Sequence, residues 1–211
     1  MGLKIGRMVL GCYQTNCYFV YREGCGNVIV IDPADCGDKI YHSLKDHGFT
    51  VGAILLTHGH FDHIWGCDKL RTLSGAEVYA LDAERELLES VTLNVSEAAG
   101  RACTVKADHF VKDGEELDFF DEIRCRVIAT PGHTGGSCSY YFEEAGFLLC
   151  GDTLFVESVG RTDFPTGSAS AIVRSIKDRL LPLPGDTKVY PGHGDMTTIE
   201  HEAKYNPFLG A

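Results

Sequence analysis

The sequence predicts a layered α/β protein in which helices cover one or more sheets. Three observations support this class. Short apolar, β-branched segments recur along the 211 residues, amphipathic helical patterns lie between several of them, and no repeat, low-complexity tract or long linker divides the chain. The composition, 44% hydrophobic and 23% charged, excludes disordered and fibrous classes. We therefore expect one domain over residues 1–211, with parallel, mixed and two-sheet arrangements all open at this point.

Eight segments have the short, apolar and β-branched character of strands. They span residues 16–21, 28–31, 53–56, 76–81, 123–129, 138–142, 147–149 and 188–190. A helix is expected after Gly37, because Ile40 and Leu44 lie on one face and Gly48 can end it.

A second helix is expected after Ser168, a residue suited to the N-cap. Its apolar residues form one stripe, as on a helix that lies on a sheet: Ile172, Val173, Ile176 and Leu180. A Glu-rich surface helix is expected over 82–90, and an irregular connection over 92–105. Neither of these two segments is assigned a role in chemistry.

The chain carries 19 Lys and Arg against 30 Asp and Glu, a formal net charge of −11, and its basic residues do not cluster. Such a surface repels nucleic acid. Residues 1–10 lack the apolar stretch of a signal peptide, and no window approaches the roughly 18 apolar residues that a membrane span needs. The nine cysteines form no tight pairs. We expect a cytoplasmic protein with reduced thiols, and with neither nucleic acid nor a membrane as partner.

The segment THGHFDH at 57–63 places three imidazoles and one carboxylate within six positions after a strand-like run. Packing four ionisable groups together is unfavourable unless a cation compensates them, so the segment predicts a metal site. If the chain stays extended, His58, His60 and Asp62 project to one side while His63 is turned elsewhere. Such a segment can serve two metals. Imidazole and carboxylate are ligands that zinc prefers, with iron and manganese as alternatives.

One segment does not complete a coordination shell, and three later segments can supply the remaining ligands. These are TPGHT at 130–134, CGDT at 150–153 and YPGHG at 190–194, each after a strand-like run. Gly and Pro beside a ligand let the backbone turn sharply at a strand end. A lone histidine is more often structural, so these assignments depend on the dense 57–63 segment. The four other histidines, His42, His47, His109 and His201, are assigned no role.

Together these segments resemble the metallo-β-lactamase-fold hydrolases, and within them the short glyoxalase II-like (hydroxyacylglutathione hydrolase-like) class. Further matching segments are TNCY at 15–18, IDP at 31–33, GRTDFP at 160–165 and NPFL at 206–209. The resemblance implies an αββα sandwich of two mixed sheets with helices on the outer faces, and a site at one edge of the sheets.

The resemblance also implies a ligand set and two divalent metal ions, for which zinc is favoured. The first metal would be held by His58, His60 and His133, and the second by Asp62, His63 and His193, with Asp152 bridging both. Asp62 and Asp152 are the expected catalytic carboxylates. Arg161 is the expected substrate-binding residue, because the matching loop of glyoxalase II-type enzymes carries a basic group that meets the thiol carrier. The alternative is that Arg161 pairs with Asp163 and only orders its loop.

The expected activity is hydrolysis of a thioester such as S-lactoylglutathione, a small acyl-thiol. Two metals about 3.5 to 4 Å apart can share a water, lower its pKa toward roughly 7, and stabilise the oxyanion formed on attack. A protein nucleophile is not expected, because the chain lacks Gly-x-Ser-x-Gly, and Cys138 and Cys150 lie in apolar runs typical of inert thiols.

Other activities stay open. The chain ends soon after His193, so we expect no C-terminal helical substrate domain, which leaves glutathione specificity open and admits lactones or other esters. A mononuclear-iron persulfide dioxygenase is the main rival, and a non-catalytic metal-binding module is another.

The net charge argues against the related tRNA-maturing nucleases, and His60 stands where flavodiiron-type domains commonly carry Glu. The lack of a metal-site Cys, together with Asp152, argues against antibiotic hydrolysis as the main activity. We expect a monomer or a small homo-oligomer.

Overall fold

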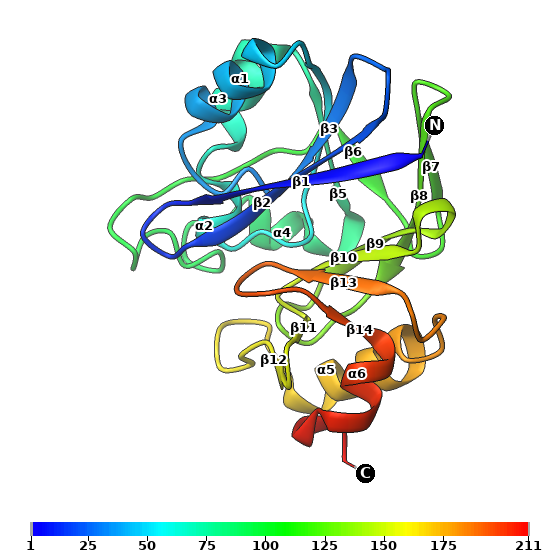
Figure 1. Ribbon diagram of the computed structural model, residues 1–211. Coiled ribbons are helices and arrows are strands. Elements are labelled where there is room, and N and C mark those ends of the chain that lie inside the picture. The colour runs from blue at the N-terminus through cyan, green and yellow to red at the C-terminus, as the bar shows by residue number, and fades with distance from the viewer. Residues whose placement is uncertain (1, 211) are drawn as a thin grey trace.

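The computed structural model describes residues 2–210, in which two six-stranded sheets lie face to face (Figure 1). The first sheet consists, in spatial order, of β1 (Leu3–Leu10), β2 (Thr15–Arg22), β3 (Asn27–Ile31), β4 (Thr50–Leu55), β5 (Glu77–Leu81) and β6 (His109–Val111). The second consists, in spatial order, of β14 (Thr197–Thr198), β13 (Lys188–Pro191), β10 (Phe147–Gly151), β9 (Cys138–Phe142), β8 (Ile123–Ala129) and β7 (Glu116–Phe119). A separate hairpin pairs β11 (Leu154–Phe155) with β12 (Ser158–Val159).

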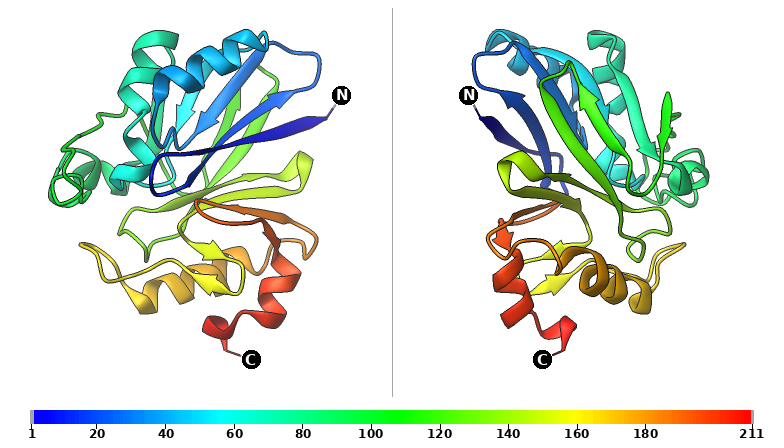
Figure 2. Two further views of the ribbon diagram at one scale, coloured as in Figure 1. Left: turned by 60° about the vertical axis from the view of Figure 1, so that its left-hand side comes forward. Right: turned by 90° about the vertical axis from the view of Figure 1, so that its right-hand side faces the viewer.

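The helices lie mainly outside the two sheets, as Figure 2 shows from two sides. They are α1 (Gly37–Asp46), α2 (Phe61–Ile64), α3 (Cys67–Ser74), α4 (Arg85–Leu88), α5 (Ala169–Ser175) and α6 (Ile199–Tyr205). A 3-10 turn (Asp82–Glu84) leads into α4, a π-helical turn (Ile176–Leu180) continues α5, and further 3-10 turns span Glu143–Ala145 and Pro207–Leu209. In the described part of the chain, none of these helices has the length and apolar character needed to cross a membrane.

Three apolar clusters separate the four layers. The central cluster lies between the sheets and includes Val20, Leu55 and Tyr140. A second cluster packs Ile40 of α1 and Leu70 of α3 against the outer face of the first sheet. A third packs residues of α5, its π-helical continuation and α6 against the second sheet. Burial on both faces explains why the central strands are nearly continuous apolar runs. The expected αββα sandwich with two mixed sheets is confirmed.

The strand directions bring the carboxyl ends of several strands to one edge of the sandwich. In the first sheet β3, β4 and β5 run parallel, and in the second β10 and β13 run parallel, with β8 in the same direction because both β8 and β10 are antiparallel to β9. Parallel strands end at the same edge of a sheet, and loops at that edge are where a rigid scaffold carries its site. The segments after β3, β4, β8, β10 and β13 therefore meet.

All eight predicted strands are present, two of them with the expected bounds, 123–129 and 138–142. The helix after Gly37 is confirmed as α1, and the helix after Ser168 as α5, where the Ser168 hydroxyl accepts a hydrogen bond from the Ala171 N–H. The irregular connection over 92–105 is also confirmed.

The expectation of a surface helix over 82–90 is partly wrong. Only the 3-10 turn and the four-residue α4 form there, and three side chains point inward, those of Glu84, Leu87 and Leu88. Contacts with loops from distant parts of the sequence bury this face, which the local pattern of charges could not indicate.

Candidate metal centre

The chain leaves β4 through the buried segment 56–60 and turns into α2 at Phe61. His60 still has an extended backbone, with φ −62° and ψ 145°, whereas Asp62 and His63 lie within α2. The expectation that Asp62 continues an extended row while His63 is turned elsewhere is therefore wrong. The helical turn instead directs both side chains to the centre, with His63 Nε2 3.9 Å from Asp62 Oδ2.

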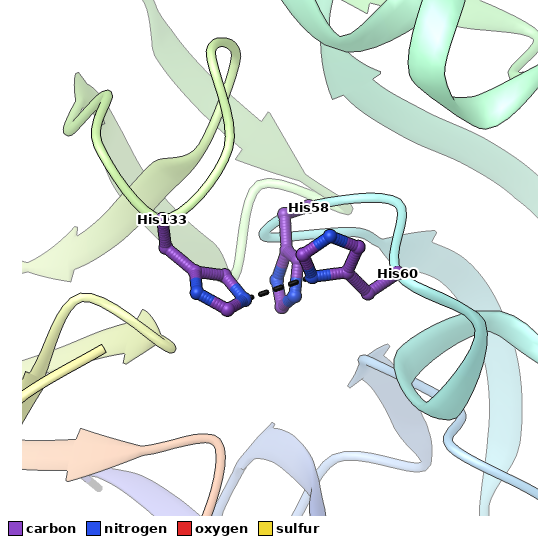
Figure 3. Close-up of side chains that lie close together, drawn as sticks. All are labelled: His58, His60 and His133. Carbon is purple, nitrogen blue, oxygen red and sulfur yellow. Dashed lines mark hydrogen bonds between the residues drawn. The ribbon is translucent and has the colours of Figure 1, made fainter. Parts of the chain in front are cut away.

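Three buried imidazoles form the first cluster (Figure 3). His58 and His60 come from the loop after β4, and His133 comes from the loop between β8 and β9. Their candidate ligand atoms all lie within 4.8 Å of one another. His60 Nδ1 lies 2.8 Å from His133 Nε2 in a hydrogen bond. The two loops, which are far apart in the sequence, thus converge on one point.

A second cluster consists of Asp62, His63 and His193, whose candidate ligand atoms also lie within 4.8 Å of one another. His193 Nε2 lies 3.2 Å from Asp62 Oδ2. Asp152, which follows β10, lies between the two clusters: its carboxylate is 3.3 Å from His63 Nε2, 3.6 Å from His133 Nε2 and 3.5 Å from His193 Nε2. All seven predicted ligands therefore meet, and Asp152 has the position that a bridging carboxylate needs.

Burial keeps His58 and His60 of the first cluster uncharged. It lowers the pKa of His60 to about 3, with help from the neighbouring His133, and it lowers the pKa of His58 well below the ordinary value of 6.5, with help from His63. Neutral imidazoles have a free lone pair, which is the form that binds a metal. His58 and His60 are therefore ready to bind a cation at neutral pH.

His63 and Asp152 behave as a charged pair. Burial alone would lower the pKa of His63, but the carboxylates of Asp152 and Asp32 outweigh burial and hold that pKa well above its usual value. Burial alone would raise the pKa of Asp152, but His63 outweighs it and holds that pKa low. The pKa of Asp62 is lowered in the same way, by His63 and His193 against the effect of burial.

The residues present fit a divalent cation. Within residues 2–210, the Nε2 atoms of His58 and His60 are buried without a hydrogen-bond partner. Buried polar atoms are rarely left unsatisfied, and such atoms in a native structure indicate a missing ligand or a functional role. The set of imidazole nitrogens and carboxylate oxygens suits zinc, iron or manganese.

Asp32 contacts a predicted ligand, His63, on the side of the ring that faces away from the centre. From the sequence alone, this residue has no assigned role. It follows β3 and accepts hydrogen bonds from the Thr57 N–H at 2.8 Å and the Thr57 hydroxyl at 2.6 Å. Its Oδ2 also lies 2.9 Å from His63 Nδ1. A carboxylate on the second nitrogen of a ligating histidine fixes the tautomer and the orientation of the ring. The only signal in the sequence was its place at a strand end, in the IDP segment at 31–33.

A cavity of about 340 Å³ opens above the centre. Its lining combines five of the predicted ligands with four aromatic rings and one cation: His60, Asp62, His133, Asp152, His193, Tyr13, Phe61, Phe155, Phe164 and Arg161. Arg161 lines the cavity and also donates two hydrogen bonds of 2.8 Å to Asp163, so the pairing with Asp163 is present, and the role in substrate binding stays a prediction. Its guanidinium carbon lies 3.8 Å from the centre of the Phe164 ring.

Cys138 and Cys150 are fully buried, and burial raises the pKa of each thiol to about 12. Such thiols are inert, as expected. The four histidines without an assigned role lie outside both clusters.

Comparison with known proteins supports the interpretation of these motifs. The model of the Metallo-beta-lactamase superfamily matches residues 10–193. A protein named "Probable metallo-hydrolase YqgX" from Bacillus subtilis (strain 168) is 38% identical to this chain, and the match covers 98% of both. The protein named "Hydroxyacylglutathione hydrolase GloC" from Haemophilus influenzae is 32% identical, and the match covers 94% of both.

Solved structures agree. BLEG-1, titled a B3 metallo-beta-lactamase, has a TM-score of 0.93 at 39% identity, covering 99% of this chain and 100% of its own. TTHA1623 in a di-iron-bound form has a TM-score of 0.86 at 35% identity, covering 97% and 100%. ETHE1 from Myxococcus xanthus has a TM-score of 0.82 at 29% identity, covering 98% and 85%. Because the family model matches most of the chain and these relatives align along nearly its whole length, the chain belongs to the metallo-beta-lactamase superfamily of metallo-hydrolases.

Proposed function

We propose that this protein is a binuclear metal-dependent thioesterase that hydrolyses a small acyl-thiol such as S-lactoylglutathione. The observation that carries the proposal is the place of Asp152, between two ligand clusters on the wall of an aromatic cavity. The relative named hydroxyacylglutathione hydrolase supports the thioester as the bond that is cleaved.

Two divalent cations would occupy the two clusters, with zinc favoured and iron or manganese as alternatives. The relative crystallised with two irons supports a pair of metals in this fold. When bound, the cations would lower the pKa of a water molecule and offset the negative charge that develops on the carbonyl oxygen. Asp32 orients His63, and Asp62 lies 3.2 Å from His193 Nε2, so the chain itself fixes the ligand geometry before substrate arrives.

The cavity and its surroundings suggest how an acyl-thiol would bind. Tyr13, Phe61, Phe155 and Phe164 provide an apolar wall for the acyl group, and Arg161 offers a cation to an anionic thiol carrier. The net charge of −11 disfavours nucleic acid as a partner. All nine cysteines are free thiols, which suits the reducing cytoplasm as the place of action.

The test is turnover of S-lactoylglutathione by the zinc-loaded protein, with the iron- and manganese-loaded forms in parallel. A His42→Ala variant is the matched control, because His42 lies outside both clusters and should keep normal activity. Metal-dependent turnover by both proteins supports the proposal.

Two further assays identify the alternatives. Oxygen uptake with glutathione persulfide in place of thioester turnover would indicate the rival dioxygenase reaction. Efficient hydrolysis of a β-lactam in place of the thioester would indicate the activity named for BLEG-1. Either result without thioesterase turnover rejects the proposal.

Replacing Arg161 by Ala is expected to raise KM for an anionic acyl-thiol several-fold and to leave kcat nearly unchanged. The guanidinium lies at the cavity wall rather than at the metal centre, so its loss removes binding shared by substrate and transition state. Steady-state kinetics measures both constants. Arg124→Ala is the control, because Arg124 forms a similar exposed pair with Asp118 outside the cavity. An unchanged KM in Arg161→Ala would exclude the assigned role.

Metal binding is expected to release at least one proton per chain at pH 7, because the pKa values of both His63 and His193 are raised above 6.5. His63 of the metal-free protein has a raised pKa and carries a proton that a metal at this imidazole must displace. A raised histidine pKa stabilises the metal-free fold below about pH 6.5, and this contribution is lost as the pH rises through the folded-state pKa. Because the metal competes with the proton on His63, apparent metal affinity should rise with pH until the pH exceeds the folded-state pKa of this histidine. Calorimetric titrations in two buffers of different ionisation enthalpy measure the proton, and identical heats in both buffers would contradict the prediction.

A further inference from the structure

Glu84 is a buried carboxylate that contacts both loops of the three-histidine cluster. The residue ends the 3-10 turn after β5, and only 1% of its surface is exposed. Its Oε1 accepts a hydrogen bond from the Gly59 N–H at 2.9 Å, and its Oε2 accepts one from the Thr134 hydroxyl at 3.0 Å. The Gly136 N–H is a third donor to the same carboxylate. Gly59 lies between two predicted ligands, His58 and His60, and Thr134 directly follows His133.

The two loops also pack against this turn at van der Waals distance. A Cβ atom at Gly136 would lie 2.4 Å from both the Ala83 carbonyl carbon and the Glu84 nitrogen. A Cβ atom at Gly59 would lie 2.8 Å from side-chain atoms of Leu87 and Leu88. The contact at Gly136 is with backbone atoms, which cannot move aside, so only glycine lets this loop approach the turn so closely. A side chain at Gly59 would require the ends of the two leucine side chains to shift. The turn and α4 therefore form a common support for both loops.

Packing alone does not account for a carboxylate in this position. Burial raises the pKa of Glu84 to about 7, so the hydrogen bonds from Gly59, Thr134 and Gly136 offset only part of the desolvation penalty of the ionised form. An apolar side chain of similar size would avoid that penalty but could not accept hydrogen bonds from both loops.

We propose that Glu84 is a positioning residue that holds the His58/His60 loop and the His133 loop at the spacing that the first metal requires. The inference rests on the metal centre of the proposed function and does not depend on the identity of the substrate. Glu84 acts through the backbone of Gly59 and through the Thr134 hydroxyl, and it does not itself reach the metal.

Glutamine cannot replace this carboxylate. Two backbone N–H groups, those of Gly59 and Gly136, donate to the side chain from different loops, and the Thr134 hydroxyl is a third donor. The amide of glutamine has one acceptor oxygen, so its NH2 group would face an N–H from one loop. Glu84→Gln should therefore release one of the two loops with little change in side-chain volume.

The experiment measures zinc affinity by competition with a chromophoric chelator, so the readout is independent of turnover. His193→Ala isolates the three-histidine site, and His133→Ala isolates the site of Asp62 and His63. In the His193→Ala background, Glu84→Gln is expected to weaken zinc binding by about 10- to 100-fold, as outer-shell changes do. In the His133→Ala background the change should stay within about threefold. Glu86→Gln is the matched control, because Glu86 lies two residues away and is exposed.

An unchanged affinity in the His193→Ala background, or an equal loss in both backgrounds, would overturn the proposal. Circular dichroism shows whether each variant folds. If Glu84→Gln does not fold, Thr134→Val answers the same question, because it removes one donor to Glu84 and keeps the side-chain shape. If Thr134→Val weakens zinc binding in the His193→Ala background more than in the His133→Ala background, even by less than expected for Glu84→Gln, the role is supported. An equal effect of Thr134→Val in both backgrounds rejects it. Because the readout is zinc affinity, the experiment tests the role of Glu84 even if the protein has no thioesterase activity.

Discussion

Asp152→Asn is expected to reduce kcat for thioester hydrolysis by about a thousandfold, the effect of removing a central electrostatic group from an active site. The carboxylate lies within 3.6 Å of three histidine Nε2 atoms from both clusters, those of His63, His133 and His193. Asparagine keeps the shape but removes the charge that compensates bound cations. The metal content should therefore fall below that of the parent protein.

The comparison needs a kinetic assay and a metal analysis on the same preparations. Asp178→Asn provides the control, because it makes the same chemical change at an exposed residue of the π-helical turn. A fully active Asp152→Asn protein that keeps its metals would show that this carboxylate does not join the two clusters.

Asp32→Asn is expected to weaken metal binding at the second cluster by about 10- to 100-fold. Asp32 accepts from the Thr57 N–H through Oδ1 and faces His63 Nδ1 through Oδ2. If the asparagine side-chain oxygen still accepts the hydrogen bond from the Thr57 N–H, the asparagine NH2 group faces His63 Nδ1. This NH2 group favours the histidine tautomer that has its proton on Nε2. That tautomer has no free lone pair toward Asp152 and the second cluster, so the ring cannot bind a metal there.

Zinc titrations in the His133→Ala background measure this effect at the second cluster alone. Asp35→Asn serves as the control, since Asp35 pairs with Arg101 at the surface, three residues away. Wild-type affinity in Asp32→Asn would mean that the tautomer of His63 does not depend on this carboxylate.

The layered fold could be predicted because its central strands are buried on both faces. Such strands are continuous apolar runs, and β8 and β9 have the predicted bounds for this reason. The strands that were missed lie at edges or are short. β1 alternates between partly buried and exposed residues, and β11, β12 and β14 are two residues long. Their pairing depends on neighbours in space, which a local pattern does not contain.

The ligands could be predicted because each lies in a distinctive segment at a strand end. The direction of Asp62 and His63 could not, because α2 begins at Phe61 without a marked N-cap signal: the residue before it, His60, makes no side-chain capping bond. Asp32 and Glu84 escaped prediction for a different reason. Their partners lie 25 to 50 residues away in the sequence, so their roles exist only once the loops have met.

The most direct test of the central claim is a titration of metal-free protein with zinc in which bound metal and S-lactoylglutathione turnover are measured on the same samples. The two clusters and the position of Asp152 predict binding of about two equivalents, with hydrolysis that is absent without metal and reaches its maximum as the second equivalent binds. Hydrolysis by the metal-free protein, or a metal-loaded protein that does not hydrolyse the thioester, would contradict the account.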